Sequence, residues 1–127
     1  MSTGGKGPIV LVVDDEPAIR LLCRVNLELE GFEVREAGTL AEARAAVAAE
    51  PPAVILLDMH VGNERGATLL TELCLRQPRI PVAMVTGSVD VEHGTRPTGV
   101  DAVIVKPFTI DELTSTVLAL AAGEDPR

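Results

Sequence analysis

Five short segments rich in apolar and β-branched residues recur along the chain. Four are unbroken apolar runs, which are typical of strands covered on both faces in a parallel sheet. The fifth alternates apolar and polar residues, which suits an edge strand with one wetter face. The unbroken runs are residues 9–13, 53–57, 82–85 and 102–105, and the alternating one is 32–36.

Helical signals separate these predicted strands. A proline in a first turn and a following glycine bound one segment, and a Thr-x-x-Glu capping-box sequence opens two others. The predicted helices run over residues 17–30, from 39 to about 50, over 67–76, and from 109 onward with an apolar stripe at Ile110, Leu113, Val117 and Leu120. This alternation predicts an α/β fold, a doubly wound five-stranded parallel sheet with helices on both faces.

The composition fits a single folded domain. The chain has 127 residues, of which 46% are apolar, and it contains no apolar run long enough to insert into a membrane. The 19 acidic and 11 basic residues give a net charge of −8, which argues against direct nucleic-acid binding. Aromatic residues make up 2%, so a stacking surface for bases or flavins is not expected.

The two cysteines do not indicate metal or redox chemistry. Cys23 and Cys74 are far apart in the sequence and lie in apolar helical contexts. Both are therefore predicted to be core residues. The first seven residues lack the apolar core of a secretory signal, which favours a cytoplasmic location.

Polar side chains follow four of the five predicted strands. Asp14 and Asp15 follow the first, Asp58 the third, Thr86 the fourth and Lys106 the fifth. Ligands bind at the carboxyl ends of parallel strands, so these groups are expected to share one pocket. Carboxylates about 4 Å apart repel by roughly 4 kcal/mol, and a cation would offset that cost. Oxygen ligands without histidine or cysteine side chains favour Mg²⁺, and the set is typical of phosphoryl transfer.

These residues make the chain resemble the receiver domain of two-component response regulators, of the single-domain, chemotaxis type. The resemblance rests on Val12–Pro17, Ile55–Met59, Gly66, Val85–Gly87 and Val105–Phe108, which occur in the family's order and spacing. It implies a flavodoxin-like sheet with strand order 2-1-3-4-5. The implied receiver domain covers residues 8–122, with flexible tails at 1–7 and 123–127.

The resemblance also implies a role for each strand-end residue. Asp58 would accept a phosphoryl group, and Asp15 would bind Mg²⁺ directly while Asp14 holds it mainly through water. Asp58 and the backbone carbonyl of His60 would complete the ligand set. Thr86 would bond a phosphoryl oxygen after transfer.

Lys106 would pair first with Asp58 and then with the phosphate, and its peptide bond to Pro107 would be cis. Such a protein accepts its phosphoryl group from a sensor histidine kinase or a phosphotransfer protein. It is a switch that assists its own phosphorylation and dephosphorylation rather than an enzyme. Its output would pass to a downstream protein through altered protein contacts.

Three features depart from the family pattern. Gly62 stands where the family usually has proline, which predicts a looser loop. Val103 stands where it usually has an aromatic residue that moves with the threonine. Residues 87–98 contain Gly94 and Pro97, which predicts a short or irregular helix there.

A non-switching pseudo-receiver that acts as an interaction module is therefore an alternative. An aspartyl-phosphate hydrolase is a third, although such enzymes usually have Asp-x-Asp after the first strand.

The first predicted helix has an unusually broad apolar arc. Beyond one stripe through Cys23 and Leu27, it carries a second at Leu21, Val25 and Leu29. One sheet needs a narrower stripe than this. Either the last helix covers the second stripe, or the stripe docks a kinase helix or a second copy of the chain in a homodimer.

Overall fold

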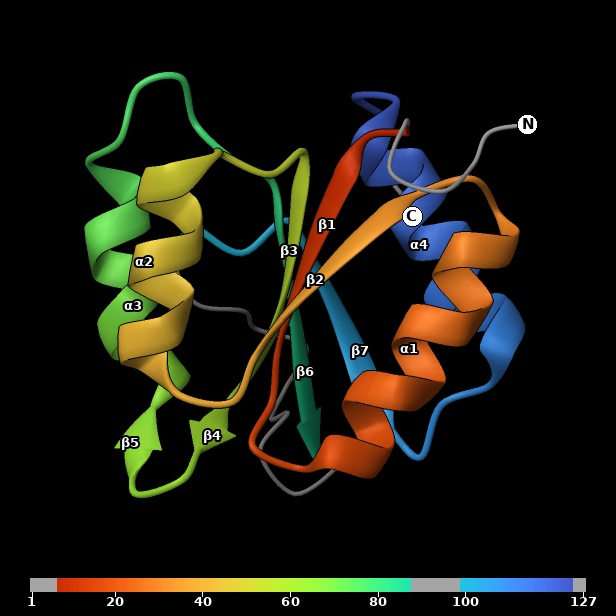
Figure 1. Cartoon of the computed structure of the whole chain (residues 1–127), viewed down its shortest axis with the longest axis horizontal. Coiled ribbons are helices and arrows are strands. Elements are labelled where there is room, and N and C mark those ends of the chain that lie inside the picture. The colour runs from red at the N-terminus through yellow and green to blue at the C-terminus, as the bar shows by residue number, and fades with distance from the viewer. Residues whose placement is uncertain (1–6, 88–98, 125–127) are drawn as a thin grey trace.

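A five-stranded parallel sheet forms the centre of the fold (Figure 1). The computed structural model describes residues 7–87 and 99–124. The sheet has the order β2-β1-β3-β6-β7, which is 2-1-3-4-5 when these five strands are counted along the chain, as predicted. The strands are β1 (Ile9–Val13), β2 (Glu33–Ala37), β3 (Val54–Asp58), β6 (Val82–Gly87) and β7 (Ala102–Lys106).

Two pairs of helices cover the two faces of the sheet (Figure 1). Helices α1 (Pro17–Leu29) and α4 (Ile110–Ala121) pack on one face, and α2 (Leu40–Ala49) and α3 (Gly66–Cys74) pack on the other. Side chains that alternate along each strand divide between two hydrophobic cores, as they must in a strand of period two. The sheet thus separates two cores, and the carboxyl ends of its strands lie together along one edge of the sheet.

Local sequence signals explain most of the helix boundaries. Helix α1 starts at Pro17 and is followed by Gly31, whose φ of 97° favours glycine. The complete capping box predicted at Thr109 is present at the start of α4. At α2 only half of the box forms, because the Glu42 carboxylate accepts a hydrogen bond from the backbone of Gly38 instead of Thr39.

Some sequence predictions about exposure are wrong. Cys23 is buried as predicted, but Cys74 is exposed, because the buried side of α3 is formed by Leu69, Leu70 and Leu73. Helix α3 also ends two residues earlier than predicted, at Cys74. Ile110, at the first residue of α4, is 37% exposed and lies outside the core stripe.

The second apolar stripe of α1 is not covered by α4. Leu21, Val25 and Leu29 are 58%, 48% and 78% exposed, respectively. The interpretation that the last helix covers this stripe is therefore wrong. No helix among residues 7–87 and 99–124 is long and apolar enough to cross a membrane.

A small hairpin that was not predicted from the sequence follows β3. Strands β4 (His60–Val61) and β5 (Glu64–Arg65) pair antiparallel across a two-residue turn of Gly62 and Asn63. Gly62 has φ of 62°, a conformation that glycine adopts without steric cost. The loop expected to be loose is thus a tight turn. The short or irregular helix predicted within residues 87–98 lies outside the described residues, apart from position 87.

Candidate functional site

Three carboxylates converge at the carboxyl edge of the sheet. Asp14 follows β1 and Asp58 ends β3, and both are buried, at 3% and 8% exposure. Asp15 is exposed beside them. One carboxylate oxygen from each lies within 4.8 Å of the others. The predicted acid pocket therefore exists in the fold.

Lys106 at the end of β7 supplies the positive charge of this pocket. Its Nζ lies 3.5 Å from Oδ2 of Asp58 and 3.6 Å from Oδ2 of Asp14. Burial alone would lower the pKa of Lys106, but the two carboxylates outweigh it and raise the pKa. The ammonium therefore stays charged at neutral pH. The peptide bond between Lys106 and Pro107 is cis, as predicted.

Asp58 has the most perturbed carboxyl group of the pocket. Burial, followed by repulsion from Asp14, raises its pKa from 3.8 to about 6. The nearby Lys106 and a hydrogen bond from the His60 backbone act in the opposite direction without cancelling the rise. The ionised form of Asp58 is thus poorly compensated by the protein alone, and an added cation would stabilise it.

The donor set fits a hard divalent cation. The candidate ligands are carboxylate oxygens from Asp14, Asp15 and Asp58, which suit Mg²⁺ better than Zn²⁺. Three negative charges and one lysine leave an excess of negative charge for an ion to neutralise. His60, whose carbonyl is a predicted ligand, is exposed two residues after Asp58.

Backbone contacts hold the segment that follows Asp58. The Met59 amide donates to the Val85 carbonyl at 2.9 Å, and the Gly66 amide donates to the Met59 carbonyl at 2.6 Å. A Cβ atom on Gly66 would overlap the backbone carbonyl oxygen of Asp58. Glycine is therefore required at position 66 for this close approach of α3 to β3.

Thr86 is buried near the carboxyl end of β6, the strand beside β3. It is 2% exposed and lies one residue beyond Val85, which pairs with Asp58 in the sheet register. Its hydroxyl donates to the Gly87 carbonyl at 3.4 Å, a long hydrogen bond. The register therefore brings Thr86 to the same edge of the sheet as Asp58.

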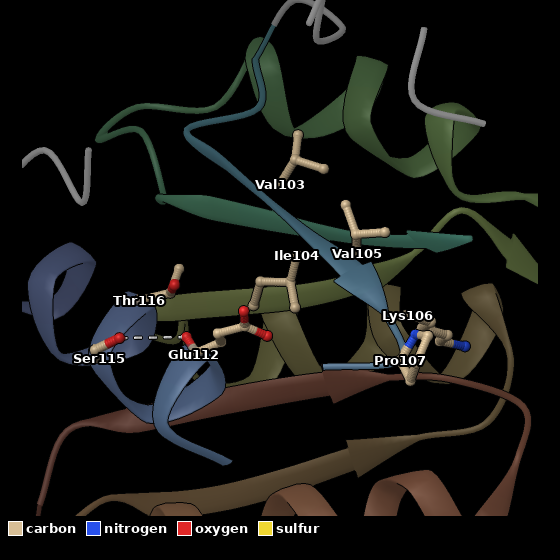
Figure 2. Close-up of a pocket in the computed structure, with 8 residues that line it drawn as sticks. All are labelled: Val103, Ile104, Val105, Lys106, Pro107, Glu112, Ser115 and Thr116. Atoms are coloured by element: carbon tan, nitrogen blue, oxygen red, sulfur yellow. Dashed lines mark hydrogen bonds between the residues drawn. The ribbon is translucent and has the colours of Figure 1, made fainter. Parts of the chain in front are cut away.

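A second pocket lies between β7 and the start of α4. It has a volume of about 490 Å³, and its lining includes Val103, Val105, Lys106 and Glu112 (Figure 2). Figure 2 shows the Lys106 ammonium pointing away from the α4 residues that line this pocket. Val103 is half-buried there and packs against the core on the α2–α3 face.

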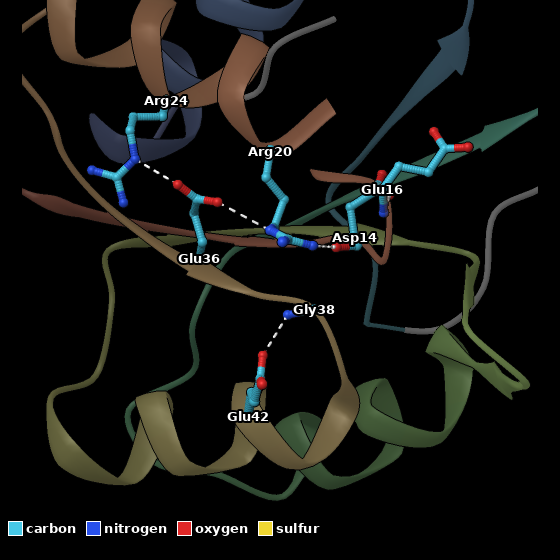
Figure 3. Close-up of polar contacts among 7 residues, drawn as sticks. All are labelled: Asp14, Glu16, Arg20, Arg24, Glu36, Gly38 and Glu42. Atoms are coloured by element: carbon cyan, nitrogen blue, oxygen red, sulfur yellow. Dashed lines mark hydrogen bonds and ion pairs between the residues drawn. The ribbon is translucent and has the colours of Figure 1, made fainter. Parts of the chain in front are cut away.

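A polar network that was not predicted from the sequence lies beside Asp14. The Arg20 guanidinium donates to the backbone carbonyl of Asp14, and Glu36 joins Arg20 to Arg24 (Figure 3). The charged residues of α1 at positions 20 and 24 are one turn apart, but no motif indicates that they meet Glu36 of β2. The packing of α1 beside β2 brings them together.

A family model described as the response regulator receiver domain matches residues 10–118. The chain belongs to the response regulator receiver domain family. The transcriptional regulatory protein PrrA of Mycobacterium tuberculosis is 35% identical to this receiver domain over 122 residues, which are 94% of this chain and 52% of PrrA. The phosphate regulon transcriptional regulatory protein PhoB of Rhizobium meliloti is 34% identical over 124 residues, covering 94% and 55% of the two chains.

Solved receiver domains have the same fold. The receiver domain of NtrX from Brucella abortus superposes with a TM-score of 0.81 at 33% identity, covering 89% of this chain and 98% of that domain. The Francisella response regulator 1452 receiver domain gives a TM-score of 0.81 at 28% identity and covers 92% and 98%. Receiver domains are phospho-acceptor switches, and this chain shares their fold and their acid pocket.

The chain spans about half the length of the curated relatives it matches. Several of these relatives are transcriptional regulators by name. The predicted single-domain, chemotaxis-type character stays a prediction, as does the expected lack of direct nucleic-acid binding.

Proposed function

We propose that this receiver domain accepts a phosphoryl group on Asp58 from a sensor histidine kinase or a phosphotransfer protein, in a Mg²⁺-dependent reaction. The observation that carries the proposal is the convergence of Asp14, Asp15 and Asp58 within 4.8 Å, with Lys106 beside two of them. Four polar residues from three separated strand ends meet there. This is the arrangement that phosphoryl transfer to a carboxylate needs.

Asp58 is the proposed nucleophile. One carboxylate oxygen attacks the phosphorus of the donor phosphohistidine, and the phosphorus–nitrogen bond breaks with its electron pair going to the imidazole, which takes up a proton. A pKa of about 6 leaves Asp58 mostly ionised at neutral pH, as a nucleophile must be. Attack by water on the acyl phosphate then releases inorganic phosphate and regenerates the carboxylate.

The remaining site residues hold charge and orient the group. We assign Asp14, Asp15, Asp58 and the His60 carbonyl as ligands of Mg²⁺, which when bound would neutralise the phosphoryl oxygens. Lys106 moves from its pairing with Asp58 to a phosphoryl oxygen. The ligand assignment of His60 follows the family resemblance.

Thr86 is the proposed sensor of the phosphoryl group. Phosphorylation adds negative charge and acceptor oxygens at Asp58, and the Thr86 hydroxyl lies on the adjacent strand. The Thr86 hydroxyl would turn from the Gly87 carbonyl toward the charged phosphoryl oxygens, which are stronger acceptors than a neutral carbonyl. This local change would bias the surface formed by neighbouring segments.

The proposed output is an altered contact with a downstream protein. We place the receiver domain at residues 8–122, with tails at 1–7 and 123–127, in the cytoplasm where the family acts. The chain's net charge of −8 supports the proposal that these residues themselves bind no nucleic acid. The exposed stripe at Leu21, Val25 and Leu29 supports docking of a kinase helix or a second copy on α1.

A non-switching pseudo-receiver is the second candidate. The half-buried Val103 favours it, because valine is too small to take part in the aromatic rearrangement that the family resemblance implies. In that case the acid pocket is retained, but phosphorylation of Asp58 does not change the surface formed by β7 and α4.

One experiment tests the proposed function. The protein is incubated with Mg²⁺ and a radiolabelled small phosphodonor, and acid-labile phosphate is measured for wild type, Asp58→Asn and a control, Asp111→Asn, whose carboxylate lies in the first turn of α4. We expect label on wild type and on the control, none on Asp58→Asn, and none when EDTA removes Mg²⁺. Equal labelling of Asp58→Asn would exclude Asp58 as the acceptor.

A conformational readout separates the two candidates. Beryllium fluoride, a stable mimic of the phosphoryl group, is added with Mg²⁺, and amide chemical shifts are compared along the chain. A switch predicts shifts both at Thr86 and at β7 and α4. Shifts confined to residues next to Asp58 would favour the pseudo-receiver.

A further inference from the structure

Asp14 is fixed by hydrogen bonds on three of its four polar atoms. Its backbone amide donates to the Ala37 carbonyl at 3.0 Å, and its Oδ1 accepts from the Glu16 amide at 2.9 Å. Its backbone carbonyl accepts from Nη1 of Arg20 at 2.6 Å. The remaining atom, Oδ2, faces Lys106 at 3.6 Å in the acid pocket. The direction of this carboxylate therefore depends on contacts made outside the pocket.

Arg20 is itself held in place by Glu36 of β2. Its Nε donates to one Glu36 oxygen at 3.0 Å, and Nε of Arg24 donates to the other at 2.6 Å (Figure 3). The hydrogen bond from Arg24 lowers the pKa of Glu36, against the effect of burial and with help from Arg20. Glu36 therefore stays ionised, and the side chain of Arg20 is only 19% exposed. A guanidinium that bridges two acceptors in this way is well ordered.

Gly38 leaves room for the Arg20 guanidinium. A Cβ atom at position 38 would stand 3.1 Å from Nη1 and 3.6 Å from Cζ of Arg20. Such a contact is tighter than ordinary van der Waals packing, so a larger side chain would displace the guanidinium. The Gly38 amide is also held, because it donates to Oε1 of Glu42 at 2.7 Å. The residue that follows β2 thus packs closely against the Arg20 guanidinium and limits its movement.

We propose that Arg20 is a positioning residue for the acid pocket. Its ion pair with Glu36, which Glu36 shares with Arg24, offsets part of its charge. Its direct link to the pocket is the hydrogen bond to the Asp14 backbone carbonyl. That bond fixes the turn between β1 and α1, and with it the carboxylate of Asp14. This inference rests on the proposed function, since it holds that Arg20 increases the affinity of the acid pocket for Mg²⁺.

The test is a calorimetric titration of metal-free protein with Mg²⁺. Arg20→Ala is expected to raise the dissociation constant about tenfold, as loss of an outer-shell contact typically does. The matched control is Arg24→Ala, which removes the other partner of Glu36 but no contact with Asp14, and it is expected to change the constant less than twofold. Gly38→Val keeps every charge but displaces Arg20, and a rise of about threefold is expected.

Two further readouts separate positioning from general stability. The ¹⁵N shift of the Asp15 amide belongs to the peptide group whose carbonyl Arg20 bonds, so it is expected to move in Arg20→Ala and not in Arg24→Ala. Phosphorylation by a small donor is expected to fall in Arg20→Ala at limiting Mg²⁺ and to recover at saturating Mg²⁺. If Arg20→Ala does not fold, Gly38→Val decides the question by the same measurements.

The outcomes distinguish this inference from the function on which it rests. Binding of Mg²⁺ by Arg20→Ala within twofold of wild type, or an equal loss in Arg24→Ala, would overturn the role of Arg20 and leave the proposed function intact. If wild type itself binds no Mg²⁺, both proposals fail together.

Discussion

Replacing Asp58 with asparagine is expected to stabilise the metal-free protein at neutral pH. The carboxyl pKa of Asp58 is raised from 3.8 to about 6, so the folded state binds its proton more tightly than the unfolded state does. Each unit of pKa difference corresponds to about 1.4 kcal/mol, so ionised Asp58 costs up to about 3 kcal/mol of stability at pH 7.5. Asparagine has nearly the same shape and no charge, and it removes this cost.

The gain should depend on pH in a defined direction. Because the folded-state pKa is the higher one, wild type loses stability as pH rises from about 4 to about 6, and the loss is complete above that window. Asp58→Asn lacks this loss. Its advantage is therefore expected to be about 2–3 kcal/mol at pH 7.5 and less than about 1 kcal/mol at pH 4.

The assay is urea unfolding at 25 °C in EDTA at both pH values, followed by circular dichroism. In a thermal unfolding experiment on a domain of this size, the same 2–3 kcal/mol would raise the midpoint temperature by roughly 6–12 °C. Asp15→Asn is the control, because Asp15 belongs to the same cluster but is exposed, and its gain is expected to stay below about 1 kcal/mol. An Asp58→Asn protein that is no more stable than wild type at pH 7.5 would refute the argument that burial and repulsion destabilise ionised Asp58.

Two further predictions concern other parts of the molecule. Gly66→Ala is expected to destabilise the fold by about 2 kcal/mol or more, because its Cβ would overlap the Asp58 carbonyl; a chemical unfolding curve unchanged from wild type would contradict this. Leu21→Ser and Val25→Ser, at 58% and 48% exposed positions on α1, are expected to change stability by less than about 0.5 kcal/mol but to weaken crosslinking to a kinase or a second copy; retained crosslinking in both assemblies would exclude α1 as the docking surface.

The sequence predicted the sheet because its strands are encoded locally. Unbroken apolar runs identified β1, β3, β6 and β7, and alternation at residues 32–36 identified the edge strand β2. The prediction that β7 is covered on both faces is wrong, because β7 is the other edge strand and Val105 is 36% exposed. The positions of Asp14, Asp58 and Lys106 directly after strands were enough to predict that they meet, since parallel strands share a carboxyl edge. The resemblance to a family added the strand order and the cis peptide bond before Pro107.

The contacts that the sequence did not predict depend on register and packing. Cys74 lies one residue beyond Leu73 at the border of the apolar side of α3, and the rotation of the helix against the sheet decides whether such a position is buried. The bridge from Glu36 to Arg20 depends on how α1 packs beside β2, which no local pattern specifies. The hairpin at Gly62 could have been predicted, because a Gly-Asn pair between short extended segments is a typical two-residue turn.

The division of the interior into two cores has a consequence for how such a switch can be read. Each strand contributes alternate side chains to the α1–α4 face and the α2–α3 face, so among the described residues the two cores lie on opposite sides of the sheet. Substitutions on opposite faces that lie more than about 10 Å apart and share no partner are therefore expected to have nearly additive effects on stability. One domain built this way can evolve a recognition surface on one face while conserving a different one on the other.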